Sequence, residues 1–365
     1  MLLSRVSFNE MFRMHYFIFS VVFLALFSTL AGAKPNVGHG VILMYHHVST
    51  DTPPSTSISP ENFAEHMAYL AKNHTVISLQ RLMQSVSAEA TAKQKLPDNA
   101  VVITFDDGYD NIALNAHPII KQYGFPYTIF INPDLIGVQP RQLSWQQVRQ
   151  LQSEGVSFAN HSSVHNHLLT GSDQPKWLEN TLADISKAEK RLKKETGQSL
   201  KYVAYPYGEF NYQLKTALRE KGYIGFGQHS GAVSTTSDFG ALPRFPAAGI
   251  YANLNTLKVK LNSLAMPVIE ISNEQPQLSF EDRQPEQILT LDLSDMLKQQ
   301  VSCFYKGDSM ILAWQENRVD ITVPEVLPVG RSRVNCTAPS ISKKGRFYWF
   351  SQPWFVPTES GNWPD

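Results

Sequence analysis

Short apolar runs alternate with amphipathic stretches through the first two thirds of the chain. The runs at residues 41–45 and 101–105 are continuous and rich in β-branched side chains, which is typical of strands buried on both faces. Further runs of this kind lie at residues 127–131, 156–159, 202–205 and 223–227. These segments predict the strands of a parallel sheet.

Helical periodicity fills the segments between these runs. Ser59 followed by Pro60 is typical of a helix N-terminus, and Phe63, Met67 and Leu70 then fall on one face. Further helices are predicted over residues 144–152, 175–196 and 211–221. Strands that alternate with helices predict an α/β fold with helices packed outside the sheet. We expect a closed or nearly closed, distorted (β/α) barrel of about seven strands.

The pattern changes after residue 251. Proline-punctuated strands without intervening helices are predicted at residues 267–271, 288–293, 301–305, 310–314, 319–323 and 346–350. Short strands in this arrangement indicate a small all-β sandwich. We therefore expect an α/β domain over residues 34–250 and a β-sandwich accessory domain over residues 267–365.

The first 33 residues have the organisation of a secretory signal peptide. Arg5 and Arg13 precede an apolar stretch at residues 16–30, and Ala31-Gly32-Ala33 supplies the small residues that a signal peptidase reads. The apolar stretch is short for a membrane span, and no later segment is apolar enough to cross a bilayer. We expect cleavage after Ala33 and export to the periplasm or the exterior, with an uncleaved anchor as the alternative.

Export makes the two cysteines interpretable. Cys303 and Cys336 are the only cysteines of the chain, and neither has the spacing of a metal site. In an oxidising compartment we expect them to form a disulfide, with two buried free thiols as the alternative.

Charge balance excludes one class of partner. Lys and Arg total 32 against 32 Asp and Glu, so no net charge draws the chain to nucleic acid or to anionic lipid. The substrate is therefore expected to be neutral or to be recognised locally. Protein partners are left open.

Polar residues follow the ends of several predicted strands, which is where barrels of this kind place their chemistry. They are His46, His47, Asp106, Asp107, His161, His165 and the segment 206–208. Two imidazoles four residues apart and one carboxylate can hold a divalent metal with an open position, as in a catalytic site. The second carboxylate beside it indicates a hydrolase.

Three of these segments resemble the motifs of a known family. Residues 104–109 (TFDDGY), 161–165 (HSSVH) and 205–208 (YPYG) are similar, in that order, to the first three motifs of the polysaccharide deacetylases, the NodB-homology or carbohydrate esterase 4 group. The resemblance covers roughly residues 41–246.

The resemblance implies a role for each motif residue. Asp107, His161 and His165 would bind the metal. Asp106 would be the general base for a metal-activated water, and the backbone N–H of Tyr207 would be an oxyanion donor. Two imidazoles and a carboxylate suit Zn²⁺, which is also the ion that the resemblance implies, and Co²⁺ or Ni²⁺ would also bind.

Two features depart from the common family pattern. The late histidine motif that supplies the general acid is missing, and the first strand instead ends in Met-Tyr-His46-His47. This resembles the rearranged poly-N-acetylglucosamine deacetylases and implies His46 as the acid, with His47 as a second candidate. The arginine of the third motif is replaced by Ala204, and Arg244 is a candidate to take its place.

Three further residues are candidates for the substrate cleft, namely Tyr109, Trp145 and His229. We expect an exported, metal-dependent hydrolase that removes N-acetyl groups from a glucosamine-containing polysaccharide. An O-acetyl esterase acting on an acetylated xylan-like glycan is one alternative. A non-catalytic glycan-binding protein is the other.

Overall fold

The computed structural model describes residues 38–87 and 95–364. The predicted signal peptide lies outside these residues. Within the described ranges, no helix combines the length and the apolar character that a membrane span requires. Residues Gly38–Asp365 cluster as one compact unit, so the domain boundaries at residues 250 and 267 stay a prediction.

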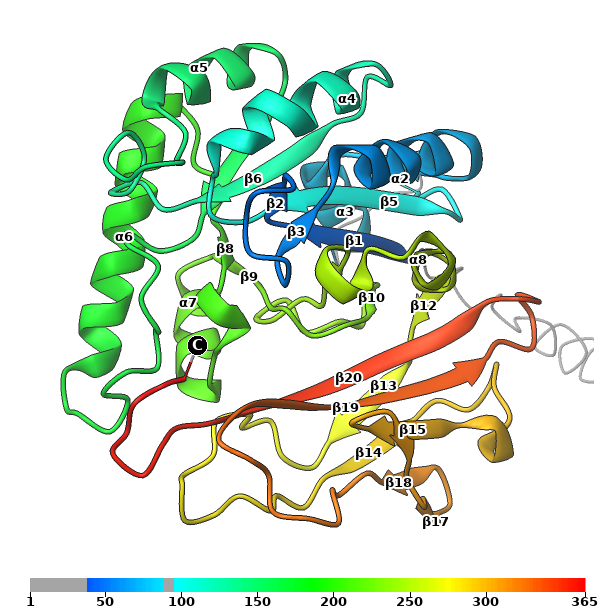
Figure 1. The fold of residues 1–365 in the computed structure, drawn as a ribbon. Coiled ribbons are helices and arrows are strands. Elements are labelled where there is room, and N and C mark those ends of the chain that lie inside the picture. Colours follow the sequence, from blue (N-terminus) through cyan, green and yellow to red (C-terminus); the bar gives the residue numbers. More distant parts are fainter. Residues whose placement is uncertain (1–37, 88–94, 365) are drawn as a thin grey trace, which may run out of the picture. The chain divides into compact units, whose positions relative to one another are not determined.

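A curled, mostly parallel sheet forms the first part of the fold (Figure 1). Its order is β10-β1-β5-β6-β7-β8-β9, and the successive neighbours from β1 to β9 pair in parallel. The strands are β1 Gly40–Tyr45, β5 Ala100–Phe105, β6 Tyr127–Ile131, β7 Ser157–Asn160, β8 Tyr202–Ala204, β9 Ile224–Phe226 and β10 Ala232–Val233. This path of seven strands confirms the predicted distorted barrel.

Helices follow the strands and cover the sheet. They are α2 Pro60–Asn73, α3 Leu79–Val86, α4 His117–Lys121, α5 Trp145–Ser153, α6 Trp177–Thr196, α7 Tyr212–Glu220 and α8 Leu254–Leu261. Minor elements are β2 His47–Val48, β3 Ser57–Ile58, β4 Thr75–Val76, η2 Ile112–Ala116, η3 Pro206–Gly208, β11 Phe245–Pro246 and η4 Gly249–Tyr251. The predicted cap forms as expected, since the Ser59 side chain accepts a hydrogen bond from the Asn62 amide. The serine therefore satisfies one of the first free N–H groups of α2.

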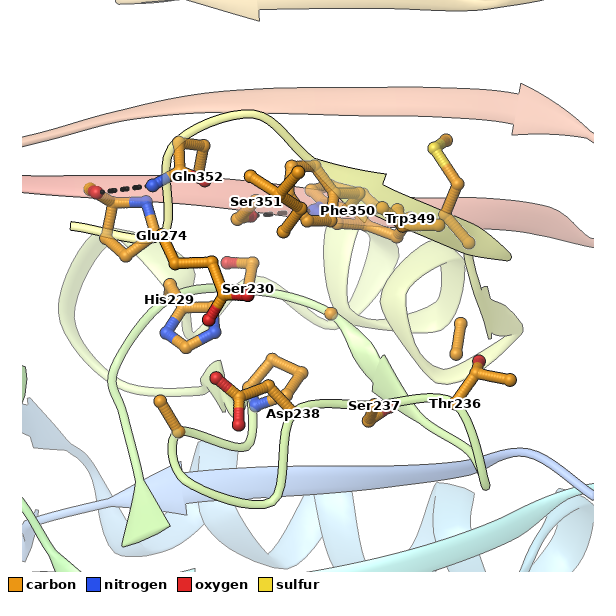
Figure 2. Close-up of a pocket in the computed structure, with 18 of the residues that line it drawn as sticks. His229, Ser230, Thr236, Ser237, Asp238, Glu274, Trp349, Phe350, Ser351 and Gln352 are labelled. Atoms are coloured by element: carbon orange, nitrogen blue, oxygen red, sulfur yellow. Dashed lines mark hydrogen bonds between the residues drawn. The ribbon is translucent and has the colours of Figure 1, made fainter. Parts of the chain in front are cut away.

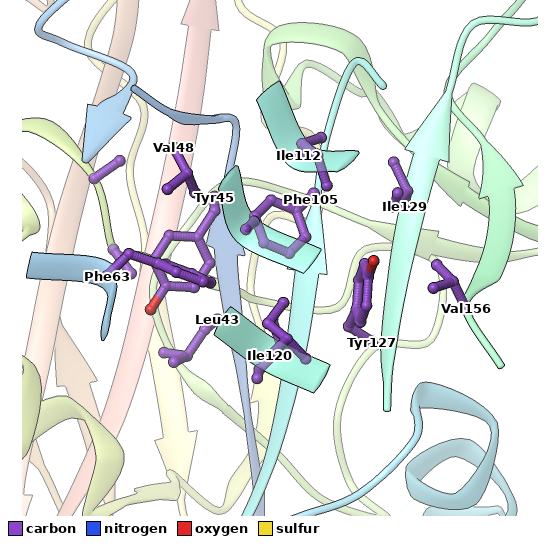
Figure 3. Close-up of a cluster of buried hydrophobic side chains, with 14 of the residues drawn as sticks. Leu43, Tyr45, Val48, Phe63, Phe105, Ile112, Ile120, Tyr127, Ile129 and Val156 are labelled. Carbon is purple, nitrogen blue, oxygen red and sulfur yellow. The ribbon is translucent and has the colours of Figure 1, made fainter. Parts of the chain in front are cut away.

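Successive side chains of the central strands point to opposite faces of the sheet and pack into two different apolar clusters. Leu43, Tyr45 and Phe105 pack toward the helices, where the Tyr45 ring lies 5.2 Å from the ring of Phe63 in α2 (Figure 3). Ile42 belongs to a second buried cluster, which includes residues of α3. Both faces of β1 are therefore buried, which explains why its sequence is apolar without alternation.

One segment hydrogen-bonds to β1 and β9, the first and last strands of the parallel series. The Leu242 amide donates to Gly225 O of β9 at 2.8 Å, and the Gly227 amide donates back to Leu242 O at 2.9 Å. Three residues later, β11 pairs in parallel with β1. We call residues 242–246 the closing segment, because they complete the barrel between β9 and β1.

Two antiparallel-rich sheets form the last part of the fold. One has the order β12-β20-β19-β15-β16 and the other β13-β14-β18-β17. Their strands are β12 Ser263–Ala265, β13 Val268–Ile271, β14 Ile288–Leu291, β15 Ser302–Tyr305, β16 Asp308–Ser309, β17 Ala313–Gln315, β18 Arg318–Asp320, β19 Gly330–Pro339 and β20 Phe347–Val356, with η5 at Lys298–Gln300. A shared apolar cluster lies between the sheets and includes Leu289, Val319, Val334 and Trp354.

The longest strand pair of this sandwich differs from the sequence prediction. The ten-residue strand β19 was not predicted, and β20 continues six residues past the predicted end at residue 350. In β19, Val334, Cys336 and Ala338 point inward between polar neighbours. The small size of two of these inward residues weakens the apolar signal of the strand.

A disulfide joins β15 to β19. Cys303 and Cys336 are bonded and occupy paired positions of the antiparallel ladder. Both are buried in the sandwich core, so the predicted disulfide is confirmed in the structure.

Removing this disulfide should destabilise the fold. The bond closes a loop of 33 residues, for which the chain-entropy relation gives roughly 3–4 kcal/mol. The double variant Cys303→Ala/Cys336→Ala should lose about this much unfolding free energy in urea denaturation. An unchanged urea midpoint would contradict the prediction.

Candidate metal centre

Three side chains from two strand ends converge on one point. His161 Nε2 and His165 Nε2 each lie 3.2 Å from Asp107 Oδ1. One ligand atom from each residue lies within 4.8 Å of the others. Asp107 follows β5 and the histidines follow β7, so the sheet brings together residues that are far apart in the sequence.

The backbone is strained at the positions that aim these side chains. Asp107 and His165 have φ values of 72° and 61°, in the left-handed region that non-glycine residues seldom occupy. Tyr207, the predicted oxyanion donor, has a φ of 58°. Such strain collects at functional sites, where the surrounding fold holds a residue in an unfavourable conformation.

The next residue must be glycine. Gly108 has a φ of 76°, and a Cβ there would lie 2.7 Å from Ile131 Cγ2. The turn that positions Asp107 therefore depends on the glycine of the Asp-Asp-Gly sequence.

Unsatisfied buried atoms fit a bound cation. Asp107 Oδ1 and His161 Nε2 are buried and receive no hydrogen bond from the described residues. His161 Nδ1 lies 2.8 Å from Ala204 O, which can only accept, so Nδ1 carries a proton and Nε2 is left to bind either a proton or a cation. His165 is one quarter exposed and marks the open side of the cluster. A divalent cation would satisfy these atoms and leave a position for water or substrate.

The electrostatics of Asp107 also favour a cation ligand. Burial would raise the pKa of this carboxyl, but the neighbouring His161 and His165 outweigh burial and hold its pKa well below the usual range. Asp107 is therefore ionised, as a metal ligand must be.

The neighbouring carboxylate has a different partner. Asp106 accepts two hydrogen bonds from Arg244, from Nη1 at 2.7 Å and from Nη2 at 2.8 Å, and both side chains are fully buried. Arg244 Nε also donates to Gly227 O at 2.9 Å, which fixes the guanidinium within the closing segment. Burial would raise the pKa of Asp106, but Arg244 outweighs it and keeps the pKa below its ordinary value. Arg244 therefore lies where the sequence analysis placed a substitute for the missing arginine.

The two adjacent histidines have different surroundings. His46 is half-buried after β1, and its charge is one of the causes that lower the pKa of both Asp106 and Asp107. His47 is buried, its Nδ1 accepts from Asn111 Nδ2 at 2.9 Å, and its ring stacks on Tyr109 at 3.7 Å. Burial lowers the pKa of His47 to about 4. Of the two, His46 is the one whose charge acts on both carboxylates.

Tyr207 is held by residues that the sequence analysis did not assign to the site. Its ring stacks on His167 at 3.8 Å and lies 4.6 Å from the ring of His165. His167 Nδ1 lies 2.8 Å from the fully buried Glu209, which also pairs with Arg331 of β19 at 3.5 Å. Glu209 directly follows the Tyr-Pro-Tyr-Gly segment, and this position beside a motif could have marked it as a site residue. No sequence feature marked Arg331 as a site residue, because the strand that carries it, β19, was not predicted.

Two of the remaining candidates differ in their distance from the cluster. Tyr109 lies beside Asp107, and burial together with that carboxylate raises the pKa of its hydroxyl. Trp145 begins α5, packs against the barrel core and has the Arg191 guanidinium 5.1 Å from its ring centre. Tyr109 therefore borders the candidate metal site. Trp145 instead contacts the barrel core and Arg191, so these contacts stabilise the fold.

His229 lines cavities beside the closing segment. One cavity, of about 440 Å³, also includes Ser230, Asp238 and Glu274 (Figure 2). Burial lowers the pKa of His229 to about 4, so its ring is neutral at neutral pH. None of the three metal-cluster residues lines this cavity.

Comparison with known proteins identifies the family. The model of the family described as "Polysaccharide deacetylase" matches residues 93–225. The putative polysaccharide deacetylase YxkH of Bacillus subtilis (strain 168) is 30% identical over 205 residues, which cover 56% of this chain and 69% of that protein. The chain belongs to the polysaccharide deacetylase family. It is therefore a hydrolase of the deacetylase type, as the sequence motifs predicted.

Other deacetylases match only part of the chain. The poly-beta-1,6-N-acetyl-D-glucosamine N-deacetylase of Staphylococcus aureus (strain MSSA476) is 31% identical over 163 residues, which span 42% of this chain and 56% of that protein. Streptococcus pyogenes deacetylase PplD has a TM-score of 0.54 at 21% identity and covers 62% of this chain and 99% of its own. IcaB from Ammonifex degensii has a TM-score of 0.54 at 20% identity, with coverage of 61% and 97%. The two structures share the deacetylase fold, and more than a third of this chain lies outside each match.

Removing Arg244 should change how stability depends on pH. Because the folded-state pKa of Asp106 is depressed, its ionisation stabilises the wild type above the unfolded pKa of about 3.9, and this stability is lost as pH falls through the folded pKa. In Arg244→Met the buried carboxylate is uncompensated, its pKa rises, and the variant should lose about 3–5 kcal/mol at neutral pH.

The measurement is urea denaturation of metal-free protein from pH 4 to pH 7. The deficit of Arg244→Met should shrink toward pH 4, where Asp106 can be protonated in the folded state. Arg318→Met, at an exposed arginine of β18, is the matched control and should show almost no deficit. An equal deficit at both ends of the range would contradict the assignment.

Proposed function

We propose that this polysaccharide deacetylase removes N-acetyl groups from a glucosamine-containing polysaccharide outside the cytoplasm. One observation carries the proposal: two adjacent carboxylates have different partners, Asp107 in the metal cluster and Asp106 on Arg244. This separation provides a metal ligand and an independent proton acceptor. The N-deacetylase activity for which the Staphylococcus aureus relative is named supports an amide of N-acetylglucosamine as the substrate.

Asp107, His161 and His165 would hold the metal ion, for which Zn²⁺ is the proposed identity and Co²⁺ or Ni²⁺ the alternatives. When bound, a divalent cation lowers the pKa of water from ~15.7 to about 7 and polarises the acetyl carbonyl. Three protein ligands leave one coordination position open for water or substrate, as expected of a catalytic metal site.

The side chains of the protein would move the protons. Asp106 accepts a proton from the attacking water, and Arg244 keeps this carboxylate ionised and oriented. The backbone N–H of Tyr207 donates to the oxyanion as the carbonyl carbon becomes tetrahedral. The C–N bond then breaks, and His46 gives a proton to the leaving nitrogen, so the products are acetate and a free amine.

Export is part of the proposal. The disulfide between Cys303 and Cys336 is consistent with an oxidising compartment, as is a substrate outside the cytoplasm. The signal peptide predicted over residues 1–33 would direct the protein out of the cytoplasm.

Metal removal should abolish the activity. The purified protein should release acetate from acetylated glucosamine oligomers, and a chelator should stop this release until Zn²⁺, Co²⁺ or Ni²⁺ is added back. Asp107→Asn should lose both metal content and activity, whereas Asp106→Asn should lose activity and retain the metal. Release from acetylxylan alone, with none from any glucosamine-containing substrate, would contradict the proposed substrate.

His46 should matter more for amides than for esters. An amine leaves poorly without a proton, whereas an alkoxide leaves more readily, so His46→Ala should reduce amide kcat by roughly 10²–10⁴-fold and ester kcat far less. His47→Ala is the neighbouring control and should change the two rates by similar factors. If His46→Ala retained full amide turnover, the acid assignment would be wrong. An ester rate far above the amide rate in the wild type would favour the O-acetyl esterase alternative.

A further inference from the structure

A second cavity begins at Tyr207 and continues along the sandwich. It has a volume of about 470 Å³ and is lined by Tyr207, Gly208 and Gln228 on the barrel side and by residues of β15, β19 and their loops on the other. Tyr207 lies against the metal-cluster residue His165, so the cavity starts directly beside the candidate site. A glycan that presents one sugar to the metal cluster would place a neighbouring sugar here.

The ionisable lining of this cavity is cationic. Lys306, Arg331 and Arg333 line it, and the lining residues, all in the described part of the chain, include no Asp or Glu. His229 adds no charge, because burial lowers its pKa to about 4.

Two of these cations are balanced by carboxylates, and one is not. Arg331 pairs with the buried Glu209 at 3.5 Å, and Lys306 pairs with Glu325 at 2.7 Å. Arg333 donates through Nη2 to the neutral hydroxyl of Tyr251 at 2.8 Å, and within the described ranges no ion pair is recorded for it. Arg333 therefore carries the uncompensated charge of the cavity.

The environment of Lys260 reflects this charge. Burial and, to a smaller extent, the neighbouring Arg333 together lower the pKa of its amine to about 8. Lys260 lies 4.5 Å from the ring centre of Tyr251, the residue to which Arg333 donates. A second amine placed near Arg333 would meet the same repulsion.

We propose that Arg333 makes this cavity a subsite for an N-acetylated sugar and disfavours a sugar that carries a free ammonium group. This inference rests on the proposed function, in which neighbouring sugars carry either an acetamido group or the amine that deacetylation leaves. An acetamido carbonyl can accept a hydrogen bond from the remaining guanidinium N–H groups. An ammonium group offers only donors and a like charge, so it gains no hydrogen bond and is repelled.

The consequence is a dependence of rate on the neighbouring sugar. Once one sugar has been deacetylated, the next target whose neighbour occupies this subsite reacts more slowly. The β-sandwich, which supplies Arg333, would thereby influence which acetyl groups the barrel removes.

The test compares two substrates of equal length. One is a fully N-acetylated glucosamine oligomer, and the other carries a single free amine next to the target sugar. We expect wild-type kcat/KM for acetate release to favour the acetylated oligomer by roughly tenfold at low salt, when the amine is protonated. The preference should shrink in high salt and disappear above the pKa of the substrate amine.

Variants separate charge from fold. Arg333→Gln removes the charge and should reduce the preference to about twofold, whereas Arg333→Lys retains the charge and should keep most of it. Arg318→Gln, on the other sheet of the sandwich, should keep the full preference. Thermal unfolding of each variant shows whether it is folded.

The outcomes distinguish the inference from the proposed function. Acetate release from both oligomers at equal kcat/KM, or a tenfold preference that survives in Arg333→Gln, would overturn the inference alone. No release from any acetylated glucosamine oligomer would overturn the proposed function and this inference with it.

Discussion

Two adjacent buried carboxylates can stay ionised only when each has its own compensating partner. Asp106 is held by the guanidinium of Arg244, and Asp107 faces the two imidazoles of His161 and His165. Without these partners, burial and mutual repulsion would raise at least one of the two pKa values. The left-handed backbone at Asp107 helps to send the two side chains in different directions. The ends of β5 and β7 and the closing segment must therefore meet at one place.

Local pattern was sufficient to predict the barrel and a meeting of one carboxylate with two histidines at its edge, and the resemblance to the deacetylase motifs then singled out Asp107 as that carboxylate. The strands are continuous apolar runs, and Asp107, His161 and His165 each follow such a run. Because parallel strands end at one edge of a sheet, their position in the sequence already implied proximity. The disulfide was predictable for a simpler reason, since the chain has only two cysteines.

Side-chain contacts between segments far apart in the sequence were harder to predict. Arg244 was a candidate to replace the missing third-motif arginine, but only the pairing of the closing segment with β9 and β1 places it on Asp106. Glu209 and Arg331 were not assigned, because an ion pair between barrel and sandwich leaves no periodic signal in either segment. The register of β19 determines that Arg331 and Arg333 approach the barrel. Such contacts follow from tertiary geometry, which residue patterns do not encode.

The position of Arg244 along the chain links closure of the barrel to the charge of Asp106. It lies 138 residues after Asp106, beyond the last strand of the parallel series. A nascent polypeptide that has emerged only as far as β9 holds an anion with no counter-charge, and sealing that anion inside would cost several kcal/mol. A barrel that closed before Arg244 was in place would hold Asp106 either protonated or uncompensated. Enclosure of the interior and ionisation of Asp106 are therefore coupled through one residue late in the sequence.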